Sequence, residues 1–138
     1  MSEANKQLIR RFYQAIDGGD PAILDQFIAR DYDDHSPPFP DLPPGSAGSR
    51  EAFHRALAAF SDFRHEVIDQ IAEGDRVVTR MTASGRHTGD FLGIPATGKE
   101  VTMTGIAVHR IVDGKIAEHW SEVDGFGLFQ QLGAFPPS

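Results

Sequence analysis

GIAVHRIVDGKIAEHWSEVD, residues 105–124, contains two runs rich in Val, Ile and Ala on either side of Asp113-Gly114. An Asp-Gly pair supplies the positive φ angles that a two-residue hairpin turn requires. The stretch therefore predicts an antiparallel hairpin of two strands, residues 101–112 and 116–124. The position of the turn also predicts which side chains share a face of this hairpin.

A second hairpin is predicted upstream by Gly74-Asp75, which separates the runs 64–73 and 76–86. These runs are rich in Val, Ile and Thr, the residues that favour strands. The four long strands thus follow one another along the chain. A last short helix is predicted around residues 126–132, ending at Gly133.

The N-terminal half has a different period. Apolar residues recur at helical spacing in residues 3–17, in a second segment that starts at Asp20-Pro21 and includes Ile28, and in a third that starts at Ser49. Between the second and third segments, residues 36–49 contain five prolines and two glycines, which predicts a surface loop that could act as a lid.

Three helices followed by a meander of strands predict an α+β fold. We expect the helices to pack on a curved, mainly antiparallel sheet of about four long strands that encloses a pocket. The 138 residues have the usual size of one domain, so a single domain over residues 1–138 is expected.

The composition excludes several classes of function. The net charge is −7 and the basic residues are scattered, whereas nucleic-acid binding needs a clustered positive field. The chain has no cysteine, which excludes disulfides and cysteine-based zinc sites. No apolar stretch is long enough to cross a membrane, and the N-terminus lacks the pattern of a signal peptide, so a cytoplasmic protein is expected.

Counting back from the Asp113-Gly114 turn places a mixed set of side chains on one face of the hairpin. That face comprises Met103, Gly105, Ala107, His109, Glu118, Trp120, Glu122 and Asp124. Small residues opposite Trp120 leave room for a ligand, so this face is predicted to form a pocket wall. The other face, with Thr104, Ile106, Val108, Arg110, Ala117, His119, Ser121 and Val123, suits burial against a partner subunit.

Each candidate residue also has a purely structural interpretation. His109 could form only an exposed cross-strand ion pair with Glu118, and Trp120 could be ordinary core. Asp124 precedes Gly-Phe-Gly and could cap the last helix. Capping and a position in the pocket do not exclude each other.

Arg80 falls opposite Asp69 in the first hairpin, which predicts a structural ion pair in preference to a ligand contact. The six histidines show no metal-binding spacing, so no metal is expected. No glycine-rich phosphate loop and no nucleophile elbow is present either.

Four segments together resemble one known family: YDDHSPP at residues 32–38, HTGDFLGIPATGKEV at 87–101, the opening stretch at 105–124, and GLFQQLG at 127–133. They resemble the SnoaL-like polyketide cyclases and predicted ester cyclases, over nearly the whole chain. The resemblance implies a cone of the NTF2-like type, a homodimer or higher oligomer, and neither cofactor nor metal.

The resemblance also implies site residues. Asp124 matches the aspartate that acts as general base near the end of the last long strand in these cyclases, and His109 is the nearest counterpart of an assisting histidine. His35 matches a histidine at the pocket mouth. Arg80 could match an arginine of the related limonene epoxide hydrolases, but Thr82 stands where their aspartate is expected, which argues against epoxide hydrolysis.

The expected function is therefore removal of a proton next to a carbonyl by Asp124, followed by intramolecular aldol ring closure of a polyketide-like ester. Desolvation beside Trp120 would raise the pKa of such a carboxyl. His35, Trp120, Met103 and Arg80 are the expected contacts to a small apolar or aromatic ligand. Two alternatives stay open: a non-catalytic ligand-binding or dimerisation module, and a hydrolase on the same scaffold.

Overall fold

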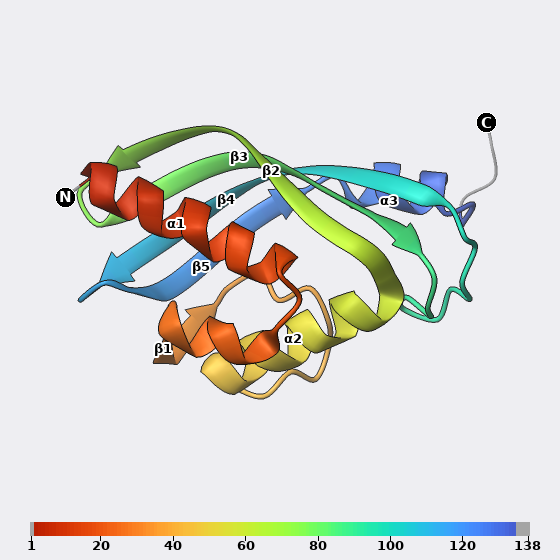
Figure 1. Ribbon diagram of the computed structural model, residues 1–138, viewed down its shortest axis with the longest axis horizontal. Helices are drawn as coiled ribbons and strands as arrows, with labels where there is room; N and C mark the ends of the chain where they lie inside the picture. The colour runs from red at the N-terminus through yellow and green to blue at the C-terminus, as the bar shows by residue number, and fades with distance from the viewer. Residues whose placement is uncertain (1, 135–138) are drawn as a thin grey trace.

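The computed structural model describes residues 2–134, so the expected domain of residues 1–138 extends beyond the described range at both ends. The elements in chain order are α1 Ser2–Asp17, the 3₁₀ helix η1 Pro21–Gln26, β1 Ile28–Asp34, α2 Ser46–Ala59, β2 Phe60–Glu73, β3 Arg76–His87, β4 Glu100–Val112, β5 Lys115–Val123 and α3 Gly125–Gln131 (Figure 1). This is an α+β fold, as predicted.

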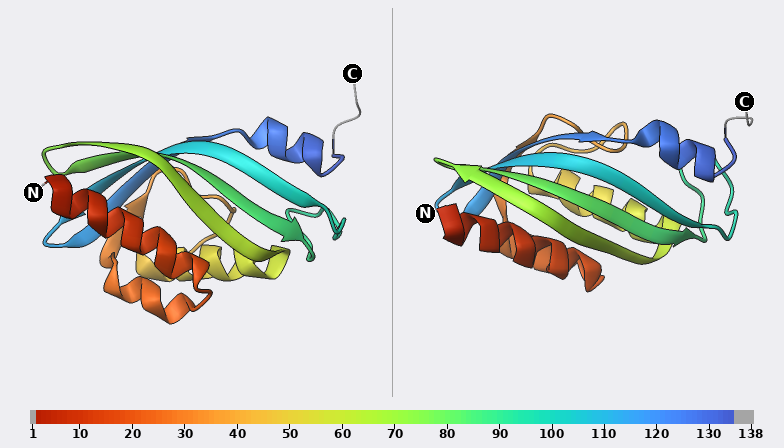
Figure 2. Two further views of the ribbon diagram at one scale, coloured as in Figure 1. Left: turned by 45° about the horizontal axis from the view of Figure 1, so that its top comes forward. Right: turned by 90° about the horizontal axis from the view of Figure 1, so that it is seen from above.

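The five strands form one sheet in the order β1-β5-β4-β3-β2. Neighbours from β2 to β5 are antiparallel, and β1 is parallel to β5. Both predicted two-residue turns are present: Gly74, Asp113 and Gly114 all have positive φ. The long strands curve over α1 and α2, which lie on the same side of the sheet (Figure 2).

The core lies between α1 and this inner face of the sheet. Ile9, Phe12 and Ile16 of α1 recur at helical spacing and pack with Val77 of β3 and Ile111 of β4. Fully burying a side chain of this size contributes about 1.5–3 kcal/mol. Helices cover only the inner face, so the polar and charged side chains of the outer face remain at the surface.

The predicted register of the last hairpin is wrong beyond its first residues. Ile111 faces Ile116, but Arg110 faces Glu118, so Ala117 is an extra residue on β5. Such a β-bulge shifts every later side chain of the strand to the opposite face. His119, not Glu118 or Trp120, therefore shares the inner face with His109.

The number and type of elements also differ from the prediction. The sheet has a fifth strand, β1, which the sequence does not reveal because its residues, IARDYDD, are rich in Asp, a poor strand former. The second predicted helix is the short 3₁₀ helix η1, and Ile28 begins β1 instead of extending that helix. The helix α2 begins at Ser46 and not at Ser49.

Residues 35–45, here called the proline-rich loop, connect β1 to α2. The ring of Phe39 packs at 6.0 Å from that of Phe91, centroid to centroid, and Arg55 of α2 lies 5.8 Å over the Phe39 ring. Arg55 also donates to the carbonyl of Pro40 at 3.1 Å. The proline-rich loop is thus attached to α2 and to the loop that contains Phe91.

None of the helices within residues 2–134 is long and apolar enough to cross a membrane.

Candidate functional site

His109 lies on the inner face of the sheet, where α1 packs against β4. It is 2% exposed, and its Nδ1 is fully buried without a hydrogen-bond partner among residues 2–134. The ring centroids of Phe12, Tyr13 and His119 lie 5.9, 6.2 and 4.9 Å from that of His109. Burial, and then the charge of His119, lower the pKa of His109 well below 6.5. The imidazole is therefore neutral at pH 7, and its single N–H can donate to a ligand oxygen.

Asp34, the last residue of β1, meets His119 of β5 beside His109. His119 Nδ1 lies 2.8 Å from Asp34 Oδ1, and the backbone N–H of Ser36 donates to the same oxygen at 2.9 Å. Burial acts to raise the pKa of Asp34, but the hydrogen bond and charge of His119 and the Ser36 N–H together lower it. Asp34 is thus ionised at neutral pH, and His119 is the donor in this pair.

Two buried tyrosines border the same region. Desolvation raises the pKa of Tyr13 on α1, and desolvation followed by the charge of Asp34 raises the pKa of Tyr32 on β1. Both phenols stay protonated at neutral pH. The Tyr13 ring also lies 4.8 Å from the ring of His65, whose Nδ1 is 2.8 Å from Asp17 Oδ1. The inner face thus carries two Asp–His pairs near His109.

A pocket of about 180 Å³ lies between β1, the proline-rich loop and the start of α2. It is lined by Tyr32, Asp33, Asp34, Pro37, Leu42, Pro43, Pro44, Gly45, Gly48 and Ser49. A water molecule occupies about 30 Å³ in the liquid, so this volume corresponds to about six waters. It can hold one ring or one ester group of a ligand, with Asp34 in its wall, and the proline-rich loop forms its cover.

Met103 lies on the inner face, at the end of the sheet near α3. It borders an apolar hollow of about 40 Å³ lined by Phe60, Phe63, Ala83, Ser84, Gly85, Val101, Met103 and Leu128. The inward position expected for Met103 is therefore observed, but its neighbours are the apolar side chains of this hollow.

A third hollow, about 1060 Å³, is an open groove along β1, the start of α2 and the β4–β5 turn. Several of its charged side chains form ion pairs or hydrogen bonds with neighbouring residues. Arg50 lies 2.6 Å from Asp25, and Lys115 donates to the carbonyls of Asp25 and Gln26. Neither His109 nor His119 lines this groove, so it is separate from the polar cluster of the inner face.

His35 and Trp120 lie together on the outer side of the sheet, away from His109. Their rings stack at 4.6 Å with an angle of 6° between the planes, and the guanidinium of Arg76 lies 5.0 Å from the centroid of the Trp120 ring. The bulge at Ala117 causes this placement of Trp120, which the predicted register had put beside His109.

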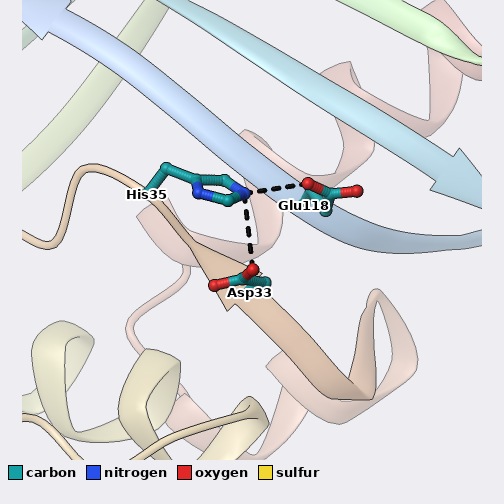
Figure 3. Close-up of side chains that lie close together, drawn as sticks. All are labelled: Asp33, His35 and Glu118. Atoms are coloured by element: carbon teal, nitrogen blue, oxygen red, sulfur yellow. Dashed lines mark hydrogen bonds and ion pairs between the residues drawn. The ribbon is translucent and has the colours of Figure 1, made fainter.

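Figure 3 shows the side chains of Asp33 and Glu118 converging on the imidazole of His35. His35 Nε2 lies 2.8 Å from Glu118 and 3.4 Å from Asp33, and the three ligand atoms all lie within 4.8 Å of one another. In the part of the chain that the structure describes, this group alone could hold a cation. The hydrogen bonds from His35 and then Arg110 lower the pKa of Glu118. Asp33, His35 and Glu118 thus form an ion-pair network together with Arg110.

Arg80 lies on the outer face of β3 and pairs with Asp69 of β2, as the first hairpin predicted. Two hydrogen bonds of 3.1 Å join the guanidinium to the two carboxylate oxygens. The hydrogen bond from Arg80 is also the main reason for the lowered pKa of Asp69. Arg80 faces away from the inner cluster, so the geometry favours the structural interpretation.

Asp124 is exposed, and its side chain caps α3 by accepting the backbone N–H of Gly127 at 2.8 Å. Its own N–H donates to the carbonyl of Thr104, five residues before His109 on β4. At about 3.4 Å per strand residue, Asp124 and His109 are separated by roughly 17 Å along the sheet. The capping alternative is therefore observed, and the buried carboxylate facing a cavity that a catalytic Asp124 needs is not.

Asp34 and His119 are the functional candidates that the sequence pattern missed. His119 was assigned to the face opposite His109, because nothing in residues 115–123 reveals the bulge. Asp34 lies next to His35 in the segment YDDHSPP, but its role depends on a contact across 85 residues. The only signal for it was a run of acidic residues before a proline-rich segment.

Comparison with known proteins identifies similar chains. The family model described as SnoaL-like polyketide cyclase matches residues 7–132. The aklanonic acid methyl ester cyclase DnrD of Streptomyces peucetius is 35% identical over 137 residues, which cover 91% of this chain and 88% of the relative.

Solved structures show the same fold. TsrD from Streptomyces laurentii superposes with a TM-score of 0.87 at 38% identity, over 96% of this chain and 97% of the other. IdmH from Streptomyces antibioticus, described as a putative polyketide cyclase, superposes with a TM-score of 0.80 at 34% identity, over 94% and 98%.

Proposed function

The chain belongs to the family of SnoaL-like polyketide cyclases, and from this premise we propose that it closes a ring in a polyketide-like ester without a cofactor. The curated relatives carry the name of one such reaction, since they are aklanonic acid methyl ester cyclases. A substrate of that chemical class, with a carbon flanked by carbonyl groups, is proposed for this chain as well.

The observation that carries this proposal is the buried, neutral His109 with its unpartnered Nδ1. A carbon flanked by carbonyls loses a proton readily, because the electron pair moves onto oxygen as an enolate. A neutral imidazole donates a hydrogen bond to that oxygen as its charge develops, and such a bond is strong in a site with little water. The enolate carbon then attacks a second carbonyl of the same molecule, which closes the ring.

The size of the site limits how a substrate binds. The 180 Å³ pocket accepts only one end of a polyketide ester, and His109 is closed off from solvent. The side chains packed around His109, those of Phe12, Tyr13 and His119, must therefore move for the reacting carbonyl to approach it. The apolar hollow at Met103 lies at the other end of the inner face, and its volume of about 40 Å³ is too small for an aromatic ring system.

The proposal predicts that the wild-type protein exchanges the acidic C–H of an aromatic β-keto ester for deuterium in D₂O. A general base contributes about 10²–10⁴-fold to such a step. We expect exchange on the order of 100-fold above buffer, followed by NMR, and conversion of aklanonic acid methyl ester to a ring-closed isomer of unchanged mass. Binding of the ester without exchange would instead support the non-catalytic module, and release of methanol with formation of the free acid would support the hydrolase.

Asp124 as the general base stays a prediction, and one variant tests it. Asn caps helices as well as Asp does, so Asp124→Asn keeps the cap of α3 and removes the carboxylate base. Loss of exchange in this variant, with an unchanged thermal transition, would assign the proton transfer to Asp124. Exchange at the wild-type rate would leave Asp124 with its capping role alone.

We also propose that two copies of the chain pair through the outer face of the sheet. One row across four adjacent strands is apolar: Ile71, Val78, Val108 and Trp120. Ile71 is 71% exposed, and Ile106 in the next row is 48% exposed. A central apolar strip between charged rows is the composition of a protein–protein interface, and a second copy offers the same strip.

Val108→Asp is expected to separate the proposed dimer, because it places a charge in the middle of the apolar row. Light scattering after gel filtration should give twice 15.1 kDa for the wild type and 15.1 kDa for the variant at equal concentration. Thr82→Asp lies on the same face outside the row and serves as the matched control. A wild type that elutes as a monomer at 100 μM would contradict the pairing.

A further inference from the structure

We propose that His119, held by Asp34, removes the carbon-bound proton in the ring closure. This inference rests on the proposed cyclase function and names its base. It depends on three features of the structure: the geometry of the Asp34–His119 pair, the free nitrogen of His119, and the pocket whose wall contains Asp34.

The geometry of the pair fixes the imidazole. Asp34 and His119 are directly paired residues of the parallel strands β1 and β5. The backbone N–H of His35 donates to the carbonyl of His119 at 2.9 Å, which ties the end of β1 to β5 at this residue. The carboxylate receives both the Nδ1–H of His119 and the N–H of Ser36. An ionised carboxylate can only accept, so neutral His119 carries its proton on Nδ1.

The other nitrogen of His119 is available for chemistry. Its Nε2 carries the lone pair and has no hydrogen-bond partner among residues 2–134. An imidazole whose N–H is held by a carboxylate is oriented to accept a proton at the opposite nitrogen, and the carboxylate then stabilises the imidazolium that forms. Asp34 is suited to this task because its lowered pKa keeps it ionised.

Access distinguishes this pair from the other Asp–His pair of the inner face. The side chains of His119 and Asp34 are 18% and 22% exposed, and Asp34 lines the 180 Å³ pocket. The side chain of His65, paired with Asp17, is 9% exposed and packs between the rings of Tyr13 and Phe63. Of the two pairs, only Asp34–His119 has a member in the wall of a described pocket, and that member is Asp34.

The step balances without a further reagent. His119 Nε2 takes the proton from the carbon between the carbonyls, and the C–H electron pair becomes the enolate, whose oxygen accepts the N–H of His109. The enolate carbon forms the new C–C bond with the second carbonyl carbon. The π pair of that carbonyl moves to its oxygen, which takes the proton back from the His119 imidazolium. The product is a cyclic alcohol of the same mass, and the protein returns to its starting state.

The test compares deuterium exchange and ring closure in the wild type, His119→Gln and Asp34→Asn, with His54→Gln on the exposed face of α2 as the matched control. We expect His119→Gln to lose on the order of 10²–10⁴-fold in rate and His54→Gln to keep the wild-type rate. Circular dichroism and thermal transitions establish that the variants are folded. A folded His119→Gln protein within tenfold of the wild type would overturn the inference.

Asp34 acts through His119, so its test needs a readout that a structural role would not change. In Asp34→Asn, kcat should fall with little change in KM, because the amide no longer stabilises the imidazolium that forms during proton transfer. The ¹⁵N shifts of His119 in the wild type should show the proton on Nδ1. A proton on Nε2 would overturn the inference whatever the activity.

The remaining outcomes separate this inference from the cyclase proposal. Exchange that is lost in Asp124→Asn but kept in His119→Gln would assign the base to Asp124 while the cyclase function stands. Absence of exchange and of ring closure in the wild type would remove the cyclase function, and the role of His119 with it.

Discussion

As the pH falls below 6.5, the protein is expected to lose stability through His109, by at most about 1.4 kcal/mol per pH unit. The folded state keeps His109 neutral, because burial and then His119 lower its pKa well below 6.5. The unfolded chain binds a proton below about pH 6.5. Stability from this residue is therefore complete above pH 6.5 and falls by at most about 1.4 kcal/mol per pH unit below it.

The surroundings of His109 support a single cause in this pH window. The titratable groups that face it are Tyr13 from α1 and His119 from β5, and His119 is paired with Asp34. Asp34 has a lowered carboxyl pKa, so its contribution is present above about pH 3.9 and is lost only at more acidic pH. The two contributions thus fall in different pH ranges.

Urea unfolding at pH 7, 6 and 5 measures this effect. His109→Gln should flatten the dependence on pH, whatever its own stability at pH 7. His54→Gln removes an exposed histidine and should leave the dependence unchanged. If the free energy of unfolding changed equally with pH in the wild type and in His109→Gln, the buried imidazole would not be held neutral.

Gly48→Ala is expected to destabilise the protein by about 1–3 kcal/mol, the usual effect of overpacking. In an ordinary helix the same change would stabilise by roughly 0.5–1 kcal/mol, because glycine loses more backbone entropy on folding than alanine. Gly48 lies in the first turn of α2, and a Cβ atom there would overlap the carbonyl oxygen of Pro43. The sign of the effect therefore shows whether the proline-rich loop is packed against α2 in solution.

Gly125→Ala is the matched control, since Gly125 begins α3 and a Cβ atom there meets nothing within 4 Å. Its stability should stay equal or rise by up to about 1 kcal/mol. Both variants are compared by thermal and urea unfolding. Gly48 and Pro43 also line the 180 Å³ pocket, so Gly48→Ala should lower the rate of ring closure. A stabilised Gly48→Ala protein would contradict the packing of the proline-rich loop.

Local chemistry was sufficient to predict much of the fold. The glycines and aspartates of the two hairpin turns fix the ends of β2 to β5, because few other residues adopt positive φ there. The same local logic correctly paired Asp69 with Arg80, five residues from the turn. Helical spacing of apolar residues identified α1, and the motifs of residues 87–133 indicated the family that the comparisons show.

The candidate site was decided by tertiary structure. One extra residue at Ala117 exchanges the faces of β5, which brings His119 beside His109 and turns Trp120 outward; no feature of the local sequence reveals this bulge. The strand β1 forms, despite its aspartates, because β5 offers it a hydrogen-bonding edge. That pairing brings Asp34 to His119 across 85 residues of chain. The sequence by itself thus determined the scaffold and the family, whereas long-range strand pairing determined which polar side chains meet inside it.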